Sequence, residues 1–284
     1  MSCILAFPNR ADEATLSGGS WTTGMPRTNL QTRTIKEAAR TTDATTASTQ
    51  FMVALPRTRK VRVLALVDHN MSLAATYRVR GYATGDLTTA TYDSGTKKVF
   101  PAAYNEITAD WDEGNFWDLS PPAEYLDGLT ASLIHVLPSD VYARNWLVEL
   151  TDTTNEAGYV QLGRLFISSG WVPAVNMNYG AAIQYEPRSE IDEAYSGAEY
   201  FYERPSPRVA RFELRGLDLT EAMTYALDAQ RVQSNSREVL FLYDLADTTH
   251  LLRRSFLGRM RTLSALEQTQ PARFGTPFEI KELL

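Results

Sequence analysis

The sequence predicts a mainly β protein, and three observations carry that prediction. Short runs rich in β-branched and aromatic residues recur up to about residue 170, several of them alternate apolar with polar side chains, and turn-forming residues separate them. In one run Tyr77 and Val79 point to one face while Arg78 and Arg80 point to the other. Strands at this spacing, without helices between them, predict an antiparallel sandwich or jelly roll. The runs are 51–56, 61–67, 75–83, 145–152 and 159–168.

A break in this pattern at residues 170–180 predicts the end of a first domain. The stretch GWVPAVNMNYG combines Gly, Pro and Asn and has no clear period, which is typical of a connection. We therefore expect a β-sandwich over residues 1–172 and a second domain over residues 173–284, with the boundary close to Pro173.

The second part is mixed, with one well-signalled helix among strands. Asp218 and Glu221 form a capping-box pattern, and apolar residues at helical spacing follow, so we expect a helix over residues 219–231. A second helical stretch near residues 249–257 has a weaker pattern. The remaining runs predict strands, namely AAIQYE, AEYFYE, VARFELRGL, EVLFLYDL and the closing FEIKELL.

Composition excludes several classes of protein. The chain of 284 residues has a formal net charge of −6 and a pI of about 5.2, which argues against a general nucleic-acid binder. Cys3 is the one cysteine, so no disulfide can form within the chain, and we expect it to be a small apolar residue in a strand. We find neither a signal peptide nor an apolar run long enough to span a membrane. These features predict a protein that is made and kept in a reducing cytoplasm, or that leaves the cell by a route other than secretion.

Sequence motifs for catalysis are scarce. The three histidines, His69, His135 and His250, have no metal-ligand spacing, and there is no nucleophile elbow or phosphate-binding loop. Asp110 and Asp112 could serve as acid–base groups or bind calcium, but the surrounding ADWDEGNFWDL is more typical of an exposed loop. We therefore expect no enzyme activity, no catalytic residues, no cofactor and no metal.

The stretch Asp68–Asn70 could be either a chemical site or a corner between two strands, because it joins a histidine to two polar residues directly after an apolar run. Asn and Asp favour corners, since their side chains bond the local backbone and tolerate left-handed geometry. His69 has no second histidine nearby in the sequence with which to share a metal. A corner between two strands is the preferred interpretation, with a ligand-facing loop and a catalytic site as the alternatives.

Residues 25–172 resemble the galactose-binding-like (discoidin, F5/8 type C) jelly roll, in the version found in tail-tip and baseplate proteins of tailed bacteriophages. The run from Ala39 to Ala44, the corner at residues 61–72 and a closing pattern that includes Trp146, Gly158 and Arg164 carry the resemblance. The second part is similar to the β-barrel core of phage distal-tail and tail-tube proteins, which carries one packed helix.

Together the two resemblances imply a structural protein of a siphophage-type tail tip or baseplate. Such proteins form rings, commonly hexameric, that join the tail tube to the tip. The implied partners are further copies of the chain, the tail tube, the tape-measure protein and the tail-tip or hub proteins. The implied location is the virion tail, assembled in the host cytoplasm. Neither nucleic-acid binding nor a membrane span is implied.

For a ring subunit, the residues of interest are those that contact its neighbours. The segment AEYFYERPSPR is aromatic and then basic, and Tyr, Trp and Arg dominate such contacts. We expect Tyr200, Tyr202, Arg208 and Arg211 to lie at a contact made by the second domain, with the sandwich projecting outward.

Two other classes remain open. The first is a carbohydrate-binding module or adhesin that contacts a glycan on the host surface, for which Arg40, Asn70 and Trp111 are the candidate sugar-facing residues, with Trp21 and Trp117 as further aromatic surfaces. The second is an enzyme with such a module attached, which would need a catalytic domain with two placed carboxylates.

Overall fold

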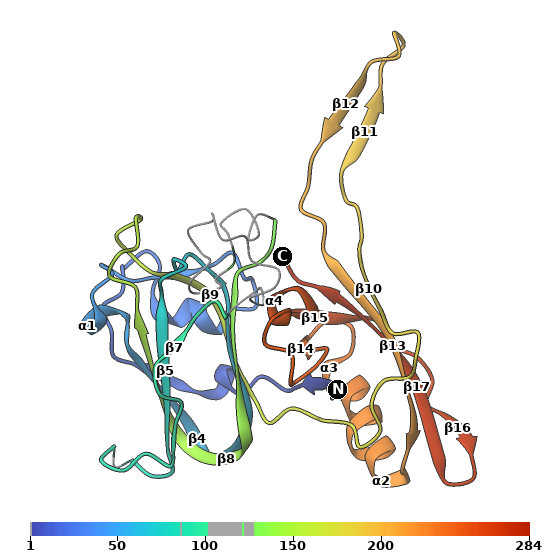
Figure 1. The fold of residues 1–284 in the computed structure, drawn as a ribbon, viewed down its shortest axis with the longest axis horizontal. Helices are drawn as coiled ribbons and strands as arrows, with labels where there is room; N and C mark the ends of the chain where they lie inside the picture. Colours follow the sequence, from blue (N-terminus) through green and yellow to red (C-terminus); the bar gives the residue numbers. More distant parts are fainter. Residues whose placement is uncertain (1, 86, 102–120, 122–127) are drawn as a thin grey trace, which may run out of the picture.

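The computed structural model describes residues 2–85, 87–101, 121 and 128–284. It shows two β units side by side and a long hairpin that projects from the second unit (Figure 1). The predicted fold class is confirmed: the chain is mainly β, with a sandwich, a curled half-barrel and one packed helical segment.

The first unit is a sandwich in which two long strands serve both layers. In the first layer, the start of β4 pairs with the end of β8, and in the second layer the end of β4 pairs with β9 and the start of β8. Burial between the layers gives the main apolar core, centred on Trp146 and Phe51. The strands are β2 (Thr15–Ser17), β3 (Ala39–Arg40), β4 (Phe51–His69), β5 (Thr76–Tyr82), β6 (Tyr92–Asp93), β7 (Lys97–Lys98), β8 (Ser132–Thr151) and β9 (Gln161–Ser168).

Three short helical turns lie on this sandwich, namely η1 (Ala11–Glu13), η2 (Arg27–Gln31) and α1 (Thr46–Thr49). The runs 51–56 and 61–67, predicted as two strands, are one strand, because pairing of β4 with β8 resumes after irregularities at Ala54/Arg59 and Val61/Val63. Strands that pass from one layer of a sandwich to the other commonly do so through such bulges. We call residues 55–62 of β4 and 137–144 of β8 the bend.

The second unit is a curled sheet in the strand order β1-β14-β15-β17-β13-β10, with β16 paired to β17. Its core is aromatic, with Phe212 stacked on Phe241 and Phe278. The strands are β1 (Ile4–Ala6), β10 (Ala182–Tyr185), β13 (Arg208–Leu217), β14 (Glu238–Leu242), β15 (Ser255–Thr262), β16 (Glu267–Gln270) and β17 (Arg273–Glu282). The short helix α4 (Leu251–Arg254) precedes β15, where the sequence predicts a helical stretch.

The predicted helix is present and extends over α2 (Leu219–Glu221), the π-helical turn η4 (Ala222–Leu227) and α3 (Asp228–Gln233). The Asp218 side chain accepts a hydrogen bond from the Glu221 N–H at 2.6 Å, which confirms the predicted cap. The buried side is made of alanines, Ala222, Ala226 and Ala229. The larger apolar side chains of the helix, Leu219, Met223 and Leu227, are exposed.

The first strand of the chain does not belong to the sandwich that was predicted over residues 1–172. β1 pairs with β14, from Ile4 opposite Leu242 to Ala6 opposite Leu240, and so forms an edge of the curled sheet. Leu5 also exchanges backbone hydrogen bonds with Trp171, at 2.9 and 2.8 Å. The second unit therefore contains residues from both sides of the sandwich. The boundary at 172/173 stays a prediction.

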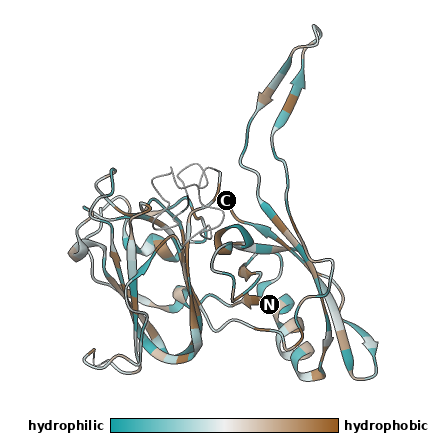
Figure 2. Ribbon diagram, in the orientation of Figure 1, coloured by the Kyte–Doolittle hydropathy of each residue, from teal (hydrophilic) through white to brown (hydrophobic). Residues whose placement is uncertain are grey.

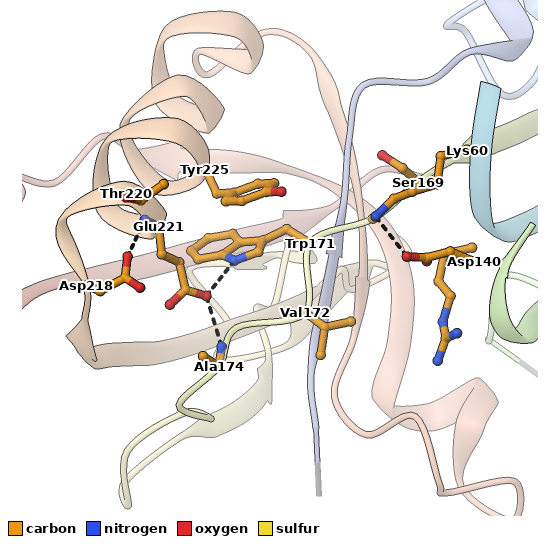
Figure 3. A pocket seen from close by; sticks show the side chains of 12 residues that line it. Lys60, Asp140, Ser169, Trp171, Val172, Ala174, Asp218, Thr220, Glu221 and Tyr225 are labelled. Atoms are coloured by element: carbon orange, nitrogen blue, oxygen red, sulfur yellow. Dashed lines mark hydrogen bonds and ion pairs between the residues drawn. The ribbon is translucent and has the colours of Figure 1, made fainter. Parts of the chain in front are cut away.

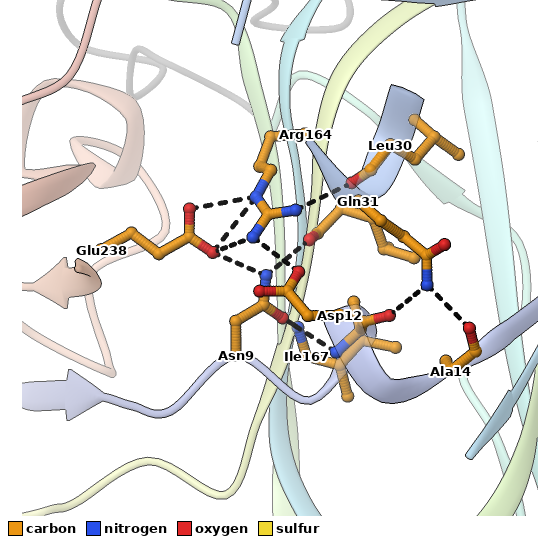
Figure 4. A network of polar contacts seen from close by, with 10 residues as sticks. Asn9, Asp12, Ala14, Leu30, Gln31, Arg164, Ile167 and Glu238 are labelled. Carbon is orange, nitrogen blue, oxygen red and sulfur yellow. Dashed lines mark hydrogen bonds and ion pairs between the residues drawn. The ribbon is translucent and has the colours of Figure 1, made fainter. Parts of the chain in front are cut away.

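A buried polar network joins the two units (Figure 4). Arg164 of β9 donates from Nε to both carboxylate oxygens of Glu238 on β14, at 3.1 and 3.0 Å, and the Arg164 side chain is fully buried. Asn9 donates to Glu238 at 2.7 Å and Asp12 lies 2.6 Å from Arg164. A third apolar cluster with residues from both units surrounds this contact. The two units are thus packed against each other through a shared core.

Candidate functional site: a sandwich corner and a projecting arm

Asp68–Asn70 has the geometry of a corner. Asp68 has a φ of 59° and pairs with Lys36 at 3.0 Å. The Asn70 side chain donates to the Tyr159 carbonyl at 3.1 Å and accepts from the Gln161 N–H at 2.7 Å, so it ties the corner to the start of β9. Both hydrogen-bonding ends of the Asn70 amide are therefore used inside the protein.

His69 of this corner is buried against the edge of the Phe100 ring. Its Nδ1 accepts from the Met71 N–H at 3.3 Å, and its Nε2 is buried without a hydrogen-bond partner among the described residues. Burial lowers the pKa of His69 to about 4, so the ring is neutral at neutral pH. No group of three metal-ligating side chains is found in the described part of the chain.

Two of the predicted sugar-facing residues converge beside the corner. Arg40 donates to the Gln161 side chain at 2.8 and 3.3 Å, and its guanidinium lies 4.1 Å from the centre of the Tyr159 ring. Asn70 bonds the backbone of Tyr159 and Gln161, as described above. Trp21 lies at the same end, since Thr22 donates to the Arg40 carbonyl, and its ring meets the edge of Phe51. The predictions for Trp111, Trp117, Asp110 and Asp112 concern residues outside the described ranges.

A cleft of about 370 Å³ lies between the two units (Figure 3). The Trp171 ring stacks on Tyr225 of the helix, 5.7 Å apart and 10° from parallel, while Glu221 accepts hydrogen bonds from the Trp171 indole and the Ala174 N–H. Across the cleft, Lys60 and Asp140 of the bend form an ion pair at 2.9 Å. These internal contacts occupy most of the polar groups that the cleft offers.

The most exposed feature of the molecule is a two-stranded hairpin made of β11 (Glu190–Glu193) and β12 (Glu199–Tyr202). We call residues 186–204 the arm. It turns at residues 194–198, where Ala194 exchanges backbone hydrogen bonds with Ala198 and Gly197. In Figure 1 it rises well clear of the curled sheet. Its two strands pair only with each other among the described residues, so its surface is open to a partner.

Both faces of the arm carry apolar groups. Ile191 lies opposite Phe201 on one face, and Tyr200 and Tyr202 lie on the other face opposite acidic residues. These four side chains are between 56% and 61% exposed. Figure 2 shows brown, hydrophobic bands on the strands of the hairpin among paler and teal positions. Monomeric proteins rarely expose such groups together without a use for them.

The base of the arm is fixed to the curled sheet. Glu186 bonds Lys281 at 2.8 Å and Arg261 at 3.1 Å. The Lys281 ammonium holds the pKa of Glu186 below its usual range, so the contact is charged at neutral pH. Arg261 continues to Glu279, which also pairs with Arg211 at 3.0 Å. These ion pairs join the base of the arm to β13, β15 and β17.

The four predicted contact residues occupy different environments. Tyr200 and Tyr202 lie on the arm, and Arg211 is exposed on β13. Arg208 does not fit the prediction: it is buried, donates from Nε to Glu282 at 2.9 Å, and lies over the Phe256 ring at 5.1 Å. Arg208 is therefore an internal ion-pair residue, because Glu282 of β17 neutralises it within the sheet.

The acidic strand β11, EIDE, was missed in the sequence, because acidic residues disfavour strands in general. The signal that would have found it is the pairing of EIDE with EYFY across a short turn that contains Gly197. None of the described helices is long and apolar enough to cross a membrane.

Comparison with known proteins gives matches among solved structures alone. No family model matches the chain, and no curated protein matches it. A family 32 carbohydrate-binding module from C. perfringens NanJ, solved with galactose, is 16% identical, with a TM-score of 0.37, over 59% of this chain and 98% of the module. The lectin-binding domain of lectinolysin, as a histidine mutant complexed with Lewis b, is 14% identical, with a TM-score of 0.37, over 57% of this chain and 97% of the domain. A Streptococcus pneumoniae fucose-binding module is 12% identical, with a TM-score of 0.36, over 57% of this chain and 95% of the module.

Proposed function

We propose that this chain is a structural subunit that assembles with copies of itself through the arm. In this proposal it is the ring component of a phage tail tip that the sequence resemblance implies, and it has no enzyme activity. The single observation that carries the proposal is the arm, which presents aromatic residues on a hairpin that is fixed at its base and has no partner within the described chain.

The rest of the molecule supports this role. The shared core and the Arg164–Glu238 contact join the two units into one body, so that a force applied to one unit is carried to the other. Side chains such as Tyr and Phe are the usual anchors of protein contacts, because they bury a large area at a small entropic cost. Strand edges left open at the base of the arm offer further places for pairing.

The test compares the full chain with a variant in which residues 188–202 are replaced by a short Gly–Ser turn. Sedimentation velocity over a concentration series is the measurement, and the unfolding midpoint shows whether the body remains folded. We expect the full chain to form a discrete oligomer and the armless variant to be a monomer with an unchanged midpoint. A full chain that stays monomeric at every concentration would count against the proposal, as would an armless variant that assembles normally.

A second candidate function is glycan binding at the sandwich corner. The observation that favours it is the Arg40 guanidinium over the partly exposed Tyr159 ring, with Asn70 holding the Tyr159 backbone in place, since sugar sites combine an aromatic surface with groups that bond hydroxyls. The structurally similar modules named above are described as carbohydrate binders. Titration with galactose and fucose, followed by NMR or calorimetry, tests it. Saturable binding that is lost in Arg40→Ala but kept in Arg231→Ala, an exposed control on the helix of the second unit, would support this function.

A further inference from the structure

We infer that the arm of one copy docks on the bend of the sandwich of a second copy. This inference rests on the proposed function, because it names the surface that the arm contacts. The occupant of the bend is thus an acidic, aromatic hairpin that belongs to the same protein. Charge, geometry and exposure at the two surfaces carry the inference.

The arm is strongly acidic. Residues 186–204 contain six carboxylates and two arginines. Glu186 is used at the base and Glu190 pairs with Arg204 at 2.9 Å, but the other four carboxylates, listed next, have no ion-pair partner in the described part of the chain. They are Asp192, Glu193, Glu199 and Glu203.

Two of these carboxylates are placed against each other. Glu193 and Glu199 are directly opposite across β11 and β12, on the face that also carries Ile191 and Phe201. Like charges at opposed positions destabilise a pair of strands. A cation supplied from outside the hairpin would relieve this repulsion, so the arm gains stability from a basic partner as well as from burial of its apolar groups.

The bend has the opposite charge. Residues 56–62, PRTRKVR, contain four cations and no carboxylate, and no stretch of seven residues outside this part of the sequence does so. Arg57 is exposed, and neither Arg57 nor Arg62 has an ion-pair partner among the described residues. The irregular pairing between Ala54 and Arg59 pushes residues 55–58 out of the ladder, as bulges do when they re-aim side chains.

The bend also offers apolar area. Tyr142 of β8 is opposite Lys60 and is 62% exposed. The one carboxylate in the facing part of β8, Asp140, is already bound to Lys60 at 2.9 Å. An arm that arrives with tyrosines and carboxylates therefore meets a tyrosine and guanidinium groups, which is a favourable combination at protein contacts.

The contact must form between molecules. Figure 1 shows the arm rising at one end of the molecule and the bend of β4 and β8 at the opposite end, so the arm does not reach its own bend. Because each copy carries both surfaces, the contact is head to tail and repeats from copy to copy. Such a contact closes into a ring when the rotation between copies permits it.

The test is a charge swap in the full chain. One variant has a basic arm, with Glu193→Lys, Glu199→Lys and Glu203→Lys. The other has an acidic bend, with Arg57→Glu, Thr58→Glu and Lys60→Glu. Each alone places like charges at the contact, so we expect its self-association to weaken by on the order of tenfold or more. In an equimolar mixture the basic arm meets the acidic bend and the native arm meets the native bend, so we expect assembly to return.

Sedimentation velocity at low salt measures both outcomes, and Glu156→Lys, on an exposed loop of the sandwich, is the control that should assemble normally. Unfolding midpoints establish that the variants are folded. Folded variants that fail to assemble even when mixed would overturn the inference. Wild-type association that is unaffected by added salt would overturn it too, since screening weakens contacts between exposed charges.

A photo-crosslinking amino acid in place of Tyr200 separates this inference from the proposed function. Links to residues 55–62 or 137–144 of a second copy support docking on the bend. Links to another surface of a second copy overturn the docking inference and leave the proposed self-assembly standing. A wild-type chain that forms no oligomer and no link between copies would overturn both the docking inference and the proposed self-assembly.

Discussion

Arg164 and Glu238 form a buried ion pair across the junction of the two units, with the Arg164 Nε within 3.1 Å of both carboxylate oxygens. Asn9 also donates to Glu238, Arg164 donates to the Leu30 carbonyl, and Asp12 adds a second carboxylate beside the guanidinium. Burial raises the pKa of Asp12, an effect that Arg164 opposes. The junction therefore depends on a balance of charges that single substitutions should disturb.

The first prediction concerns this pair. Glu238→Ala should lower the free energy of unfolding by about 2–4 kcal/mol, because it takes the buried carboxylate from Arg164 and leaves the partly exposed Asp12 as the only carboxylate beside the guanidinium among the described residues. Urea unfolding is the measurement. The matched control is Glu279→Ala, which removes a surface carboxylate from Arg211 and Arg261 and should cost under about 1 kcal/mol. Equal losses in the two variants would show that the junction pair has no special role.

The second prediction concerns pH. His135 is bonded by the Tyr77 and Tyr92 hydroxyls at 3.0 and 2.8 Å, and burial lowers its pKa from 6.5 to about 4. Between these values the unfolded chain binds a proton that the folded chain does not, so stability falls as the pH drops from about 6.5 toward 4. The slope from this one group is about 1.4 kcal/mol per pH unit.

His135→Gln should therefore reduce the dependence of unfolding free energy on pH in that window, while His69, whose pKa is also lowered to about 4, still contributes. The same substitution at an exposed position, His250→Gln, is measured beside it as the control. An unaltered slope in His135→Gln would contradict the prediction.

The third prediction concerns the corner. Asn70→Ala removes the hydrogen bonds to the Tyr159 carbonyl and the Gln161 N–H and should cost about 1–3 kcal/mol of unfolding free energy. Asn235→Ala, at an exposed position beyond the helix, should change it little. Chemical denaturation distinguishes the two, and a corner variant as stable as the wild type would show that Asn70 does not hold β9.

The fourth prediction concerns Gly163 of β9. A Cβ at this position would lie 2.7 Å from the Ile35 carbonyl oxygen and 2.9 Å from that of Val67, so both would have to move. Gly163→Ala should therefore destabilise the sandwich by roughly 1–3 kcal/mol. Gly24→Ala, where a Cβ meets open space, is the control. Thermal unfolding of both variants should show a lower midpoint for Gly163→Ala alone.

The sequence predicts local features of this fold well and distant pairings poorly. The Asp218 cap and the strand character of residues 199–202 follow from neighbouring residues, and both are confirmed. That β4 continues through residues 55–62 depends on bulged pairing with β8, about 80 residues away, which no local pattern reveals. The place of Ile4–Ala6 at the edge of β14 depends on residues far along the chain in the same way.

In the candidate site, too, local features follow from the sequence and contacts between distant residues do not. The exposure of Tyr200 and Tyr202 agrees with their place in an aromatic segment that has few apolar neighbours. Arginine is exposed in most proteins, so the sequence gives no sign that Arg208 is enclosed. Its burial is decided by Glu282, which is distant in the sequence and adjacent in the sheet. The meeting of Arg40 with Tyr159 likewise required the paired strands β3 and β9.

The bridge between Leu5 and Trp171 has a consequence for how this architecture can vary. It brings together the two points at which the chain enters and leaves the sandwich. The sandwich is therefore inserted between β1 and the other strands of the curled sheet, which is the host of the insert. An insert whose ends lie this close can be exchanged for another module with equally close ends, provided that the new module also supplies an apolar surface for the shared core and a cation for Glu238. The curled sheet and its arm would then be the constant part of the architecture, and the inserted module would be the part that varies.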